Sequence, residues 1–327
     1  MEKVLVTGGA GYVGSVLVPM MVEAGYNVRV LDKLMHANSY ALSLTQAGGR
    51  SLLNHPNFDG LVVGDIRDER TVRDAVKGRD SIIHLAALVG EPACDKKYPE
   101  LAPSVNVTGT QILLDARSRS QKFVYASSGS NYGKVESGRC IEGVTPLNPL
   151  SLYSRTKAAA EEGVLADGGV AYRLPTCFGL SPRFRRDLLL HTFADELVNR
   201  KHLAIFQPNM NRPFLHITDM ARAYLFALEN FGAMKGEAFN VSDEQSNRTK
   251  AQLAELVNNA IQEKFGYKGT VSAMEGFDPD CRDYVLDSAK ISQIGKGFKP
   301  QVTIEEGVKE LVVFFKNFKQ PDLFGNF

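Results

Sequence analysis

A tyrosine and a lysine stand four residues apart at Tyr153 and Lys157, so a helix would carry both side chains on one face. A phenol is a poor base at its ordinary pKa of about 10, but a neighbouring ammonium favours the phenolate and makes proton abstraction feasible near neutral pH. Ser127 and Ser128 end a predicted strand upstream, and a hydroxyl there could bind the oxygen that Tyr153 deprotonates. These residue types suit proton transfer at a substrate alcohol, although Tyr153 and Lys157 alone would also fit an exposed helix face.

Three glycines, Gly8, Gly11 and Gly14, stand between the first predicted strand and the first predicted helix. Glycine at such positions permits a sharp turn, a close approach of the backbone to a pyrophosphate, and tight packing of the helix on the strand. The helix N-terminus then offers free N–H groups to the anion. The spacing is G-x-x-G-x-x-G, and its place between strand and helix predicts a dinucleotide-binding turn.

An acidic residue, Asp32, ends the second predicted strand. A carboxylate there can accept both hydroxyls of an adenosine ribose and would repel a 2′-phosphate, which favours NAD over NADP. Lys33 follows directly and weakens this argument, and Asp32 could also simply close the strand in a turn. Asp65 ends the third strand, where it could meet an adenine edge or cap the helix that follows.

The elements that must position these residues alternate regularly in the first half of the chain. Short apolar runs predict strands at 4–7, 26–32, 61–64, 81–85, 122–127 and 170–174. Helical stretches separate them near 13–24, 68–77, 104–119 and 151–165. This alternation predicts an α/β fold with a doubly wound parallel sheet and helices on both faces.

After about residue 175 the pattern loosens, and we expect a smaller and less regular unit. Helices are predicted near 187–200, 218–230, 249–265 and 303–317, and strands near 203–206 and 237–241 could return to the main sheet. The predicted division is therefore a Rossmann domain over 1–175 and a mostly substrate-binding domain over 176–327.

Composition excludes several classes of protein. The 327 residues carry 38 Lys and Arg against 37 Asp and Glu, a net charge of +1, so nothing predicts a nucleic-acid partner. The 4 cysteines form no C-x-x-C pair, so neither a zinc ribbon nor a disulfide framework is expected, and we predict no metal site. The sequence shows no apolar run of about 18 residues and no signal peptide at its start, so we expect a cytoplasmic protein without a membrane partner.

The motifs together resemble a family, the extended short-chain dehydrogenases/reductases that act as NAD-dependent nucleotide-sugar epimerases and dehydratases. The resemblance runs through nearly the whole chain, over Thr7–Ser15, Asp32, Asp65-Ile66, His84–Ala87, Val105–Thr110, Tyr125–Gly133, Tyr153–Lys157, Arg212–Asp219 and Arg282–Asp287. It implies an NAD-binding Rossmann domain, a C-terminal nucleotide-sugar-binding domain, NAD as the cofactor and a nucleotide sugar as the substrate.

The resemblance also implies roles for single residues. Ser128, 25 residues before Tyr153, matches the catalytic hydroxyl that works with Tyr153 and Lys157. The implied cofactor-binding residues are Gly8, Gly11, Tyr12, Val13, Gly14, Asp32, Asp65, Ile66, Ala86, Ala87, Asn106, Tyr153 and Lys157. The implied substrate-binding residues are Arg183, Arg212 and Arg282. Arg212 and Arg282 match arginines that clamp the substrate diphosphate, although without the family either would be read as a surface ion pair.

Within this family, the residues after the catalytic hydroxyl indicate the reaction. Its dehydratases carry an Asp-Glu pair there, whereas this chain has Gly129 and Ser130, which cannot supply a carboxyl proton. Its 3,5-epimerase/reductases use a cysteine near this strand, but here Cys140 lies in the following loop. What remains is redox chemistry at sugar C4 through a 4-keto species. We expect a 4-epimerase, with a 4-dehydrogenase or a 4-ketoreductase as the alternatives.

Two segments depart from ordinary UDP-galactose epimerases. Arg183, Arg185 and Arg186 cluster in Ser-Pro-Arg-Phe-Arg-Arg, and Glu91–Cys94 follows the fourth strand. Both resemble a branch that includes enzymes oxidising C4 of GDP-linked heptoses, although the arginines would equally fit an ion-paired surface loop.

Two further expectations concern the class of protein and its assembly. A non-catalytic NAD(H)-sensing regulator on the same fold is a competing interpretation, and the intact Ser128, Tyr153 and Lys157 argue against it. A homodimer is expected, paired through the helices at 104–119 and 151–165, because both carry apolar positions beyond one core-facing stripe.

Overall fold

Parallel strands form the central sheet of the computed structural model, which describes residues 1–36, 40–43, 45–47, 49–276 and 283–318, with the backbone alone for residues 46, 136 and 137. Within these residues the sheet has 7 strands in the order β14-β9-β7-β6-β1-β2-β5, and every neighbouring pair is parallel. In chain order the strands are β1 (Lys3–Thr7), β2 (Asn27–Asp32), β5 (Phe58–Val63), β6 (Ser81–His84), β7 (Lys122–Ser128), β9 (Val170–Leu174) and β14 (Ala238–Asn240).

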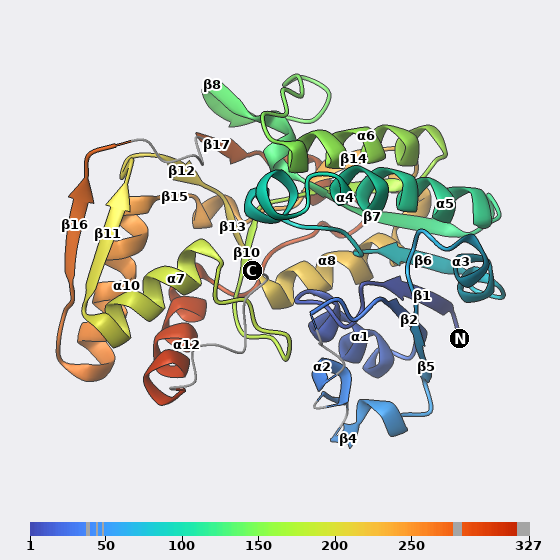
Figure 1. The fold of residues 1–327 in the computed structure, drawn as a ribbon, viewed down its shortest axis with the longest axis horizontal. Helices are drawn as coiled ribbons and strands as arrows, with labels where there is room; N and C mark the ends of the chain where they lie inside the picture. Colours follow the sequence, from blue (N-terminus) through green and yellow to red (C-terminus); the bar gives the residue numbers. More distant parts are fainter. Residues whose placement is uncertain (37–39, 44, 48, 277–282, 319–327) are drawn as a thin grey trace.

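Helices cover both faces of this sheet (Figure 1). The helices α1 (Gly14–Glu23) and α8 (Ile217–Glu229) lie on one face, and α3 (Glu69–Val76), α5 (Gly109–Ala116) and α6 (Leu152–Ala166) lie on the other. Successive strand residues point to opposite faces, so Val4 and Val6 join the core under α1 and α8 while Leu5 joins the core under α3 and α5. The doubly wound α/β fold predicted from the sequence is confirmed.

The strand order reverses at β1, which lies between β2 on one side and β6 on the other. Helices therefore leave the two neighbouring strands toward opposite faces, and a crevice opens beyond the carboxyl ends of the strands, where ligands bind in open α/β sheets. Thr7 ends β1 and His84 ends β6, and the Thr7 Oγ1 atom lies 2.7 Å from His84 Nδ1. This contact marks the point at which a nucleotide site is expected.

A second lobe follows the Rossmann part and has a core of its own (Figure 1). It contains α7 (Leu189–Asp195), which continues as a π-helical turn η5 (Glu196–Arg200), and the helices α10 (Lys250–Phe265) and α12 (Ile304–Asn317). The strand β11 (His202–Phe206) pairs with β16 (Thr270–Met274) at the outer edge of this lobe and does not return to the main sheet. The strand β14 does return, where it pairs with β9.

Short strand pairs connect the two lobes near the crevice, and their irregular sequences gave no prediction. They are β10 (Thr176–Phe178) with β13 (Phe214–His216), β8 (Lys134–Cys140) with β17 (Asp283–Leu286), and β12 (Asn211–Arg212) with β15 (Arg248–Thr249). The remaining elements are α2 (Tyr40–Ser43), β3 (Gln46–Ala47), β4 (Arg50–Ser51), α4 (Leu101–Pro103), α9 (Phe231–Met234), α11 (Ala289–Ser292), the 3₁₀ turns η1 (Leu52–Asn54), η4 (Gly129–Tyr132) and η6 (Glu244–Ser246), and the π-helical turns η2 (Pro92–Lys97) and η3 (Ser104–Thr108). None of the described helices has both the length and the apolar character needed to cross a bilayer.

Candidate active site

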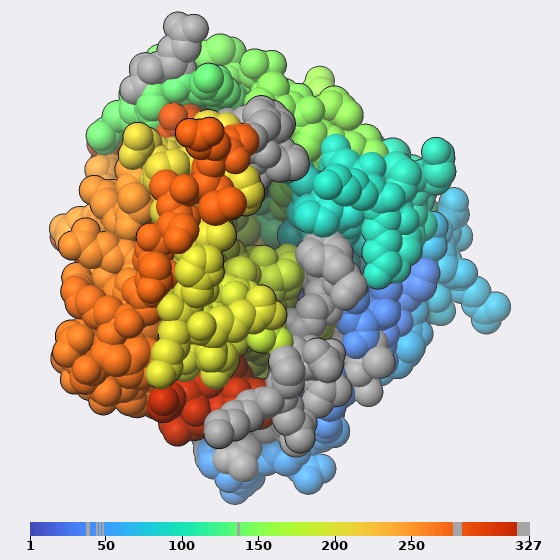
Figure 2. All heavy atoms as spheres, turned by 60° about the vertical axis from the view of Figure 1, so that its left-hand side comes forward, coloured from blue at the N-terminus to red at the C-terminus, as the bar shows by residue number. Residues whose placement is uncertain are grey.

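A cavity of about 710 Å³ lies at the carboxyl ends of the central strands, between the two lobes. Figure 2 shows part of the hollowed face, where the yellow segment near β11 and the teal segment near α4 border a recess. The lining includes almost every residue that the sequence predicted for the site: Gly8, Gly11, Tyr12, Val13, Gly14, Asp32, Asp65, Ile66, Ala86, Ala87, Ser128, Tyr153, Lys157, Arg183 and Arg212. Two predicted residues differ, because Asn106 lies behind the wall and Arg282 lies outside the described residues.

The glycine-rich turn leaves no room for side chains. Gly8 has a φ of +72°, and a Cβ there would lie 2.7 Å from the backbone nitrogen of Ala86. A Cβ on Gly14 would lie 2.5 Å from the Gly8 carbonyl oxygen. Val13, the N-cap residue of α1, makes no side-chain cap bond, and residues 11–14 line the cavity. A phosphate that enters the cavity could therefore accept hydrogen bonds from N–H groups at the start of this helix. These features fit a dinucleotide pyrophosphate.

The backbone fixes Asp32 in the wall of the cavity. Its Oδ2 atom accepts a hydrogen bond from the Ala10 N–H at 3.0 Å, and Oδ1 accepts one from the Leu34 N–H at 2.8 Å. Burial raises the pKa of this carboxyl, and the two backbone N–H groups and the charge of Arg183 oppose that rise. Each carboxylate oxygen retains acceptor capacity for a ribose hydroxyl.

Asp65 is engaged by cations and does not cap the helix that follows. Arg67 donates to it at 2.6 Å and Lys33 at 2.9 Å, and the hydrogen bond with Arg67 is the main reason that the pKa of Asp65 lies well below its usual range. Asp68 caps α3 instead, because its side chain accepts the Thr71 N–H at 2.7 Å. Lys33 therefore pairs with Asp65. Its place next to Asp32 is for that reason a weaker objection to the prediction that Asp32 favours NAD over NADP.

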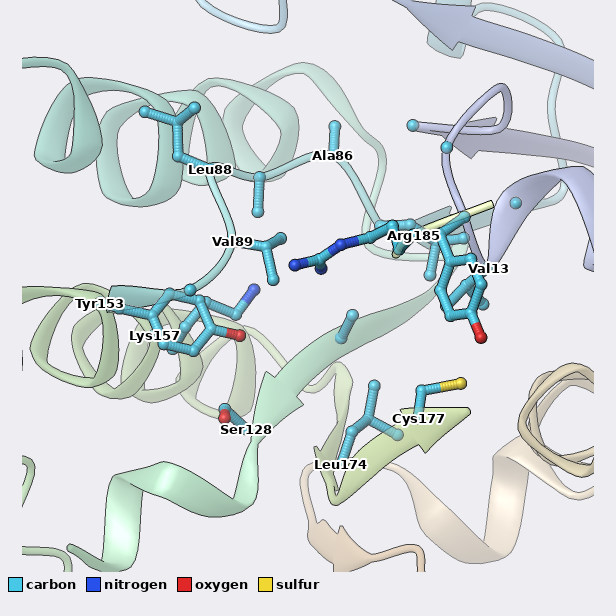
Figure 3. A pocket seen from close by; sticks show the side chains of 18 of the residues that line it. Val13, Ala86, Leu88, Val89, Ser128, Tyr153, Lys157, Leu174, Cys177 and Arg185 are labelled. Atoms are coloured by element: carbon cyan, nitrogen blue, oxygen red, sulfur yellow. The ribbon is translucent and has the colours of Figure 1, made fainter. Parts of the chain in front are cut away.

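The three arginines after Pro182 have separate surroundings. Arg183 is buried, its Nη1 atom donates to the Phe184 carbonyl at 2.7 Å, and its charge acts on Asp32. Its backbone N–H donates to Ser15 Oγ at 3.3 Å, so it lies against the start of α1, at the end of the cavity that holds the glycine-rich turn. Arg185 extends into the middle of the cavity (Figure 3) and pairs with Asp187, with an Nε–Oδ1 distance of 3.1 Å.

Arg186 lies outside the cavity lining and pairs with Asp195, with an Nε–Oδ2 distance of 2.6 Å. It therefore fits the ion-paired interpretation, whereas Arg183 and Arg185 line the cavity. Arg212 is also buried in the wall, where its Nη1 atom donates to the Asn211 carbonyl at 2.9 Å.

The helix α6 and the strand β7 bring the candidate catalytic side chains together. Figure 3 shows the phenol of Tyr153 and the ammonium of Lys157 side by side on α6, with Ser128 at the end of β7 beneath them. Burial lowers the pKa of Lys157 to about 7, with smaller opposing effects from Cys94 and Glu161. A lysine that titrates near neutrality beside a phenol is suited to proton transfer.

Three side chains hold the N-terminus of α6. Ser151 and Ser154 form a reciprocal capping box, with N–H to Oγ distances of 3.1 and 3.0 Å. Asp95, from the η2 turn after β6, accepts the Leu152 N–H at 2.8 Å and the Tyr153 N–H at 3.4 Å. An anion at a helix N-terminus is favourable. Asp95, directly after the Glu91–Cys94 segment noted in the sequence, therefore positions the helix that carries Tyr153 and Lys157.

The structure distinguishes the two serines of β7. The Ser127 hydroxyl donates to the carboxylate of Glu161 and accepts from Asn131 Nδ2 at 3.0 Å, so buried groups already engage it. The Ser128 Oγ atom lies 2.6 Å from Ser130 Oγ. Ser128 is therefore the better candidate to bind a substrate oxygen.

Neither of the two residues after Ser128 carries a carboxyl group. A Cβ on Gly129 would lie 3.1 Å from both Leu286 Cδ1 and Tyr284 Cε2, so a larger residue there would require repacking. The hydroxyl of Ser130 is bonded to Ser128.

Asn106 lies behind the cavity wall and makes structural hydrogen bonds there. Its Oδ1 atom accepts the Leu88 N–H at 2.8 Å, and its Nδ2 atom donates to the Leu88 carbonyl and to Thr156 Oγ1, both at 3.0 Å. It therefore ties the loop after β6 to α6. Sequence reasoning missed Asp95, because its contacts join residues 57 and 58 positions apart and no local pattern marks them.

A glycine cradle, a buried acid at the end of β2 and a Ser–Tyr–Lys group facing one cavity define a Rossmann-fold enzyme that uses a nicotinamide dinucleotide. Comparison with known proteins gives the family. Residues 4–242 match the model of the NAD dependent epimerase/dehydratase family, and the chain belongs to that family. The predictions of the family and of NAD as its cofactor are confirmed.

Individual relatives carry different activities. A chain from Streptomyces niveus named dTDP-glucose 4,6-dehydratase is 30% identical, with 98% of this chain and 96% of the relative covered. The UDP-glucose 4-epimerase of Thermus thermophilus, solved with NAD, is 25% identical and superposes with a TM-score of 0.75 over 96% of this chain and 98% of its own. A dTDP-glucose 4,6-dehydratase from Streptomyces venezuelae, solved with NAD, is 25% identical with a TM-score of 0.79 over 96% and 97%. The family is therefore established, whereas these relatives divide between two reactions.

Proposed function

We propose that this protein is a nucleotide-sugar 4-epimerase that works through a 4-keto sugar. One observation carries the proposal: Ser128, Tyr153 and Lys157 face the same cavity as the glycine cradle, while Gly129 and Ser130 follow Ser128 where a dehydratase needs acids. The proposal includes the cofactor role of the glycine-rich turn, Asp32, Asp65, Ile66, Ala86 and Ala87. When bound, NAD supplies the hydride acceptor and the hydride donor.

The protein's own residues move the proton. In the proposed reaction Tyr153 takes the proton from the sugar C4 hydroxyl as the C4 hydride departs, and the Lys157 ammonium stabilises the phenolate. Ser128 binds the same oxygen and stabilises the 4-keto group. For epimerisation the 4-keto sugar turns over in the cavity and receives hydride on its other face, while Tyr153 returns the proton to the oxygen.

Cationic side chains in the lining suit a substrate diphosphate. Arg212 and Arg185 both line the cavity, and a guanidinium can bind phosphate oxygens with two parallel hydrogen bonds. Arg183 lies against the start of α1, where its N–H donates to Ser15 Oγ, so its position favours contact with the cofactor over contact with the sugar. The substrate role of Arg282 stays a prediction from the resemblance.

Elimination of water from C5 and C6 of the sugar needs an acid that protonates the departing C6 hydroxyl. The serine hydroxyl at position 130 is a far weaker acid than a carboxyl group, and position 129 has no side chain. The relatives named 4,6-dehydratases therefore support the family and the first oxidation step, but not the later elimination.

The experiment is to incubate the purified protein with UDP-, GDP-, dTDP- and CDP-linked hexoses and heptoses and to identify products by mass and chromatography. A product of unchanged mass and altered retention supports a 4-epimerase. A product lighter by two hydrogens, with bound NADH, indicates a 4-dehydrogenase, and uptake of hydride by a 4-keto sugar indicates a 4-ketoreductase. Bound NAD without turnover of any sugar nucleotide would favour a regulator.

A further inference from the structure

A buried carboxylate lies one helical turn beyond Lys157, at Glu161, which is 2% exposed. Its Oε1 atom accepts hydrogen bonds from Arg173 Nε at 2.9 Å and Arg173 Nη2 at 2.6 Å. Its Oε2 atom accepts from the Ser127 hydroxyl and from Asn131 Nδ2, the latter at 3.3 Å. Both carboxylate oxygens are thus held by protein groups, as a buried charge requires.

These contacts join every element that carries the candidate catalytic side chains. Tyr153, Lys157 and Glu161 follow at four-residue intervals on α6, so they share one helix face. Ser127 directly precedes Ser128 on β7, and Asn131 lies in the turn η4 that contains Ser130. The Glu161 carboxylate therefore fixes the strand that carries the hydroxyl relative to the helix that carries the phenol and the ammonium.

Arg173 extends this network away from the cavity. It comes from β9, its Nη1 atom donates to the Tyr132 hydroxyl at 2.7 Å, and its guanidinium lies 4.9 Å from the centre of the Tyr132 ring. The Tyr132 hydroxyl donates in turn to Asn240 Oδ1 on β14 at 3.0 Å. The ion pair is thereby anchored to two further strands of the sheet.

Lys157 needs a nearby anion to keep its charge in such a buried site. The titratable groups that face it come from α6, β7, β6 and η2, and they are Tyr153, Glu161, Tyr125, His84 and Cys94. Burial raises the pKa of Cys94 to about 12 and that of Tyr125 well above 10, and burial lowers the pKa of His84 to about 3, so these three groups are neutral at pH 7. Glu161 is the carboxylate in this set.

We propose that Glu161 is a positioning residue for the reaction: held by Arg173, it sets the geometry between Ser128 and Tyr153 and places a negative charge one helical turn from Lys157. The catalytic part of this inference rests on the proposed function. A buried ion pair is by itself a poor source of stability, so the inference predicts effects on Lys157 and on turnover that a purely structural pair would not produce.

The test compares Glu161→Gln with Glu162→Gln, which makes the same change at the exposed neighbouring position. A ¹³C NMR titration of the lysine ε-carbons, assigned with Lys157→Met, reports the charge of Lys157 without any substrate. We expect Lys157 to titrate about one pH unit lower in Glu161→Gln than in the wild type, because a close anion is removed. Glu162→Gln should titrate as the wild type does.

Turnover gives the second readout. We expect Glu161→Gln to lower kcat about 10-fold or more, while KM for the sugar nucleotide and the amount of bound NAD change little, since Glu161 is not among the residues that line the cavity. Glu161→Asp keeps the charge but shortens the reach to Arg173 and Ser127. It should leave the titration of Lys157 near that of the wild type and still lower kcat.

Removal of one partner can unfold a protein by leaving the other charge buried and unpaired, so the double variant Glu161→Gln with Arg173→Gln tests the positioning role without an unpaired charge. Because it removes a cation together with the anion, Lys157 should titrate closer to the wild-type pH than it does in Glu161→Gln, while kcat should still fall. An unchanged titration in folded Glu161→Gln, or an unchanged kcat in the double variant if only that one folds, would overturn the inference. If the wild type turns over no sugar nucleotide, the proposed function fails, and the NMR titration still tests the charge effect by itself.

Discussion

The Lys157 ammonium lies 4.2 Å from the centre of the Tyr125 ring, over the aromatic face of a residue on β7. The face of an aromatic ring attracts a cation, but this attraction does not replace the hydration that the ammonium loses on burial. Lys157 is only 3% exposed. The pKa of Lys157 therefore falls to about 7, with burial as the main cause. The Lys157 charge, which we propose to stabilise a Tyr153 phenolate, is thus sensitive to pH near neutrality.

This relationship predicts the alkaline limb of the pH profile. Lys157 carries its charge below its pKa and loses it as the pH rises through about 7, so we expect kcat/KM to fall above that region instead of near pH 10. The steady-state rate measured from pH 5 to pH 10 checks this. A profile that is flat to about pH 10 would show that Lys157 keeps its proton or that its charge is not needed.

The phenol of Tyr153 is predicted to be the group that exchanges the proton. Tyr153→Phe removes that oxygen but keeps the ring, which packs with Leu88, Cys94 and Ala102. We expect turnover to fall by about 10²–10⁴-fold with NAD still bound, the usual contribution of a general acid–base group. A variant with a near-normal rate would mean that another group serves as the base.

Asp32 is predicted to set the choice of cofactor. Its carboxylate is fixed by the backbone of Ala10 and Leu34 and should repel a 2′-phosphate. The wild type should bind NAD(H) more tightly than NADP(H), and Asp32→Ala should narrow the difference, as measured by fluorescence titration with both reduced cofactors. Equal or tighter binding of NADP(H) by the wild type would refute this role.

The tight packing of the glycine-rich turn predicts a strong response to a single methyl group. In Gly14→Ala the new Cβ would lie 2.5 Å from the Gly8 carbonyl oxygen, a backbone atom that cannot move aside cheaply. We expect a loss of about 1–3 kcal/mol in unfolding free energy and weaker NAD binding. Gly232→Ala is the matched control, because a Cβ added there would meet no atom within 4 Å apart from its chain neighbours and the backbone of its own helix. Equal stability and NAD affinity in the two variants would argue against the cradle.

The homodimer stays a prediction, and the outer surface of the helices named for it is mostly polar. Gln111 and Asp115 on α5 and Arg155 and Glu162 on α6 are exposed, with Ile112 partly exposed among them. Sedimentation equilibrium at micromolar concentration should give the mass of two chains. The mass of one chain would end this expectation.

Local patterns predicted the parts of the site that depend on neighbours in the sequence. The glycine turn follows directly from β1, and the Tyr153–Lys157 spacing is a property of one helix, so both could be read from the sequence. Contacts between distant segments could not. Asp95 meets α6 across 57 residues, and β8 pairs with β17 across more than 140 residues, without any repeated pattern to match them.

The surroundings of two residues could be known only from the fold. The resemblance implies that Arg183 binds the substrate, yet the path of the chain after β10 brings it against Ser15 at the start of α1. Glu161 could have been noticed, because it continues the four-residue spacing of Tyr153 and Lys157, but only the tertiary structure shows its partner Arg173. In both cases the sequence gives the residue type, but the residues that contact it come from other elements of the fold.

The proposed 4-epimerase removes hydride from C4 of the sugar, returns it to the other face of C4, and leaves the C6 oxygen in place. The most direct measurement uses a sugar nucleotide that the protein turns over, labelled with deuterium at C4, and follows the label by mass spectrometry and NMR. We predict a 4-epimer of unchanged mass in which deuterium has returned to C4, because neither Gly129 nor Ser130 can supply a carboxyl proton to the C6 hydroxyl. A product that has lost water and carries the deuterium at C6 would show a 4,6-dehydratase and contradict the proposed 4-epimerase.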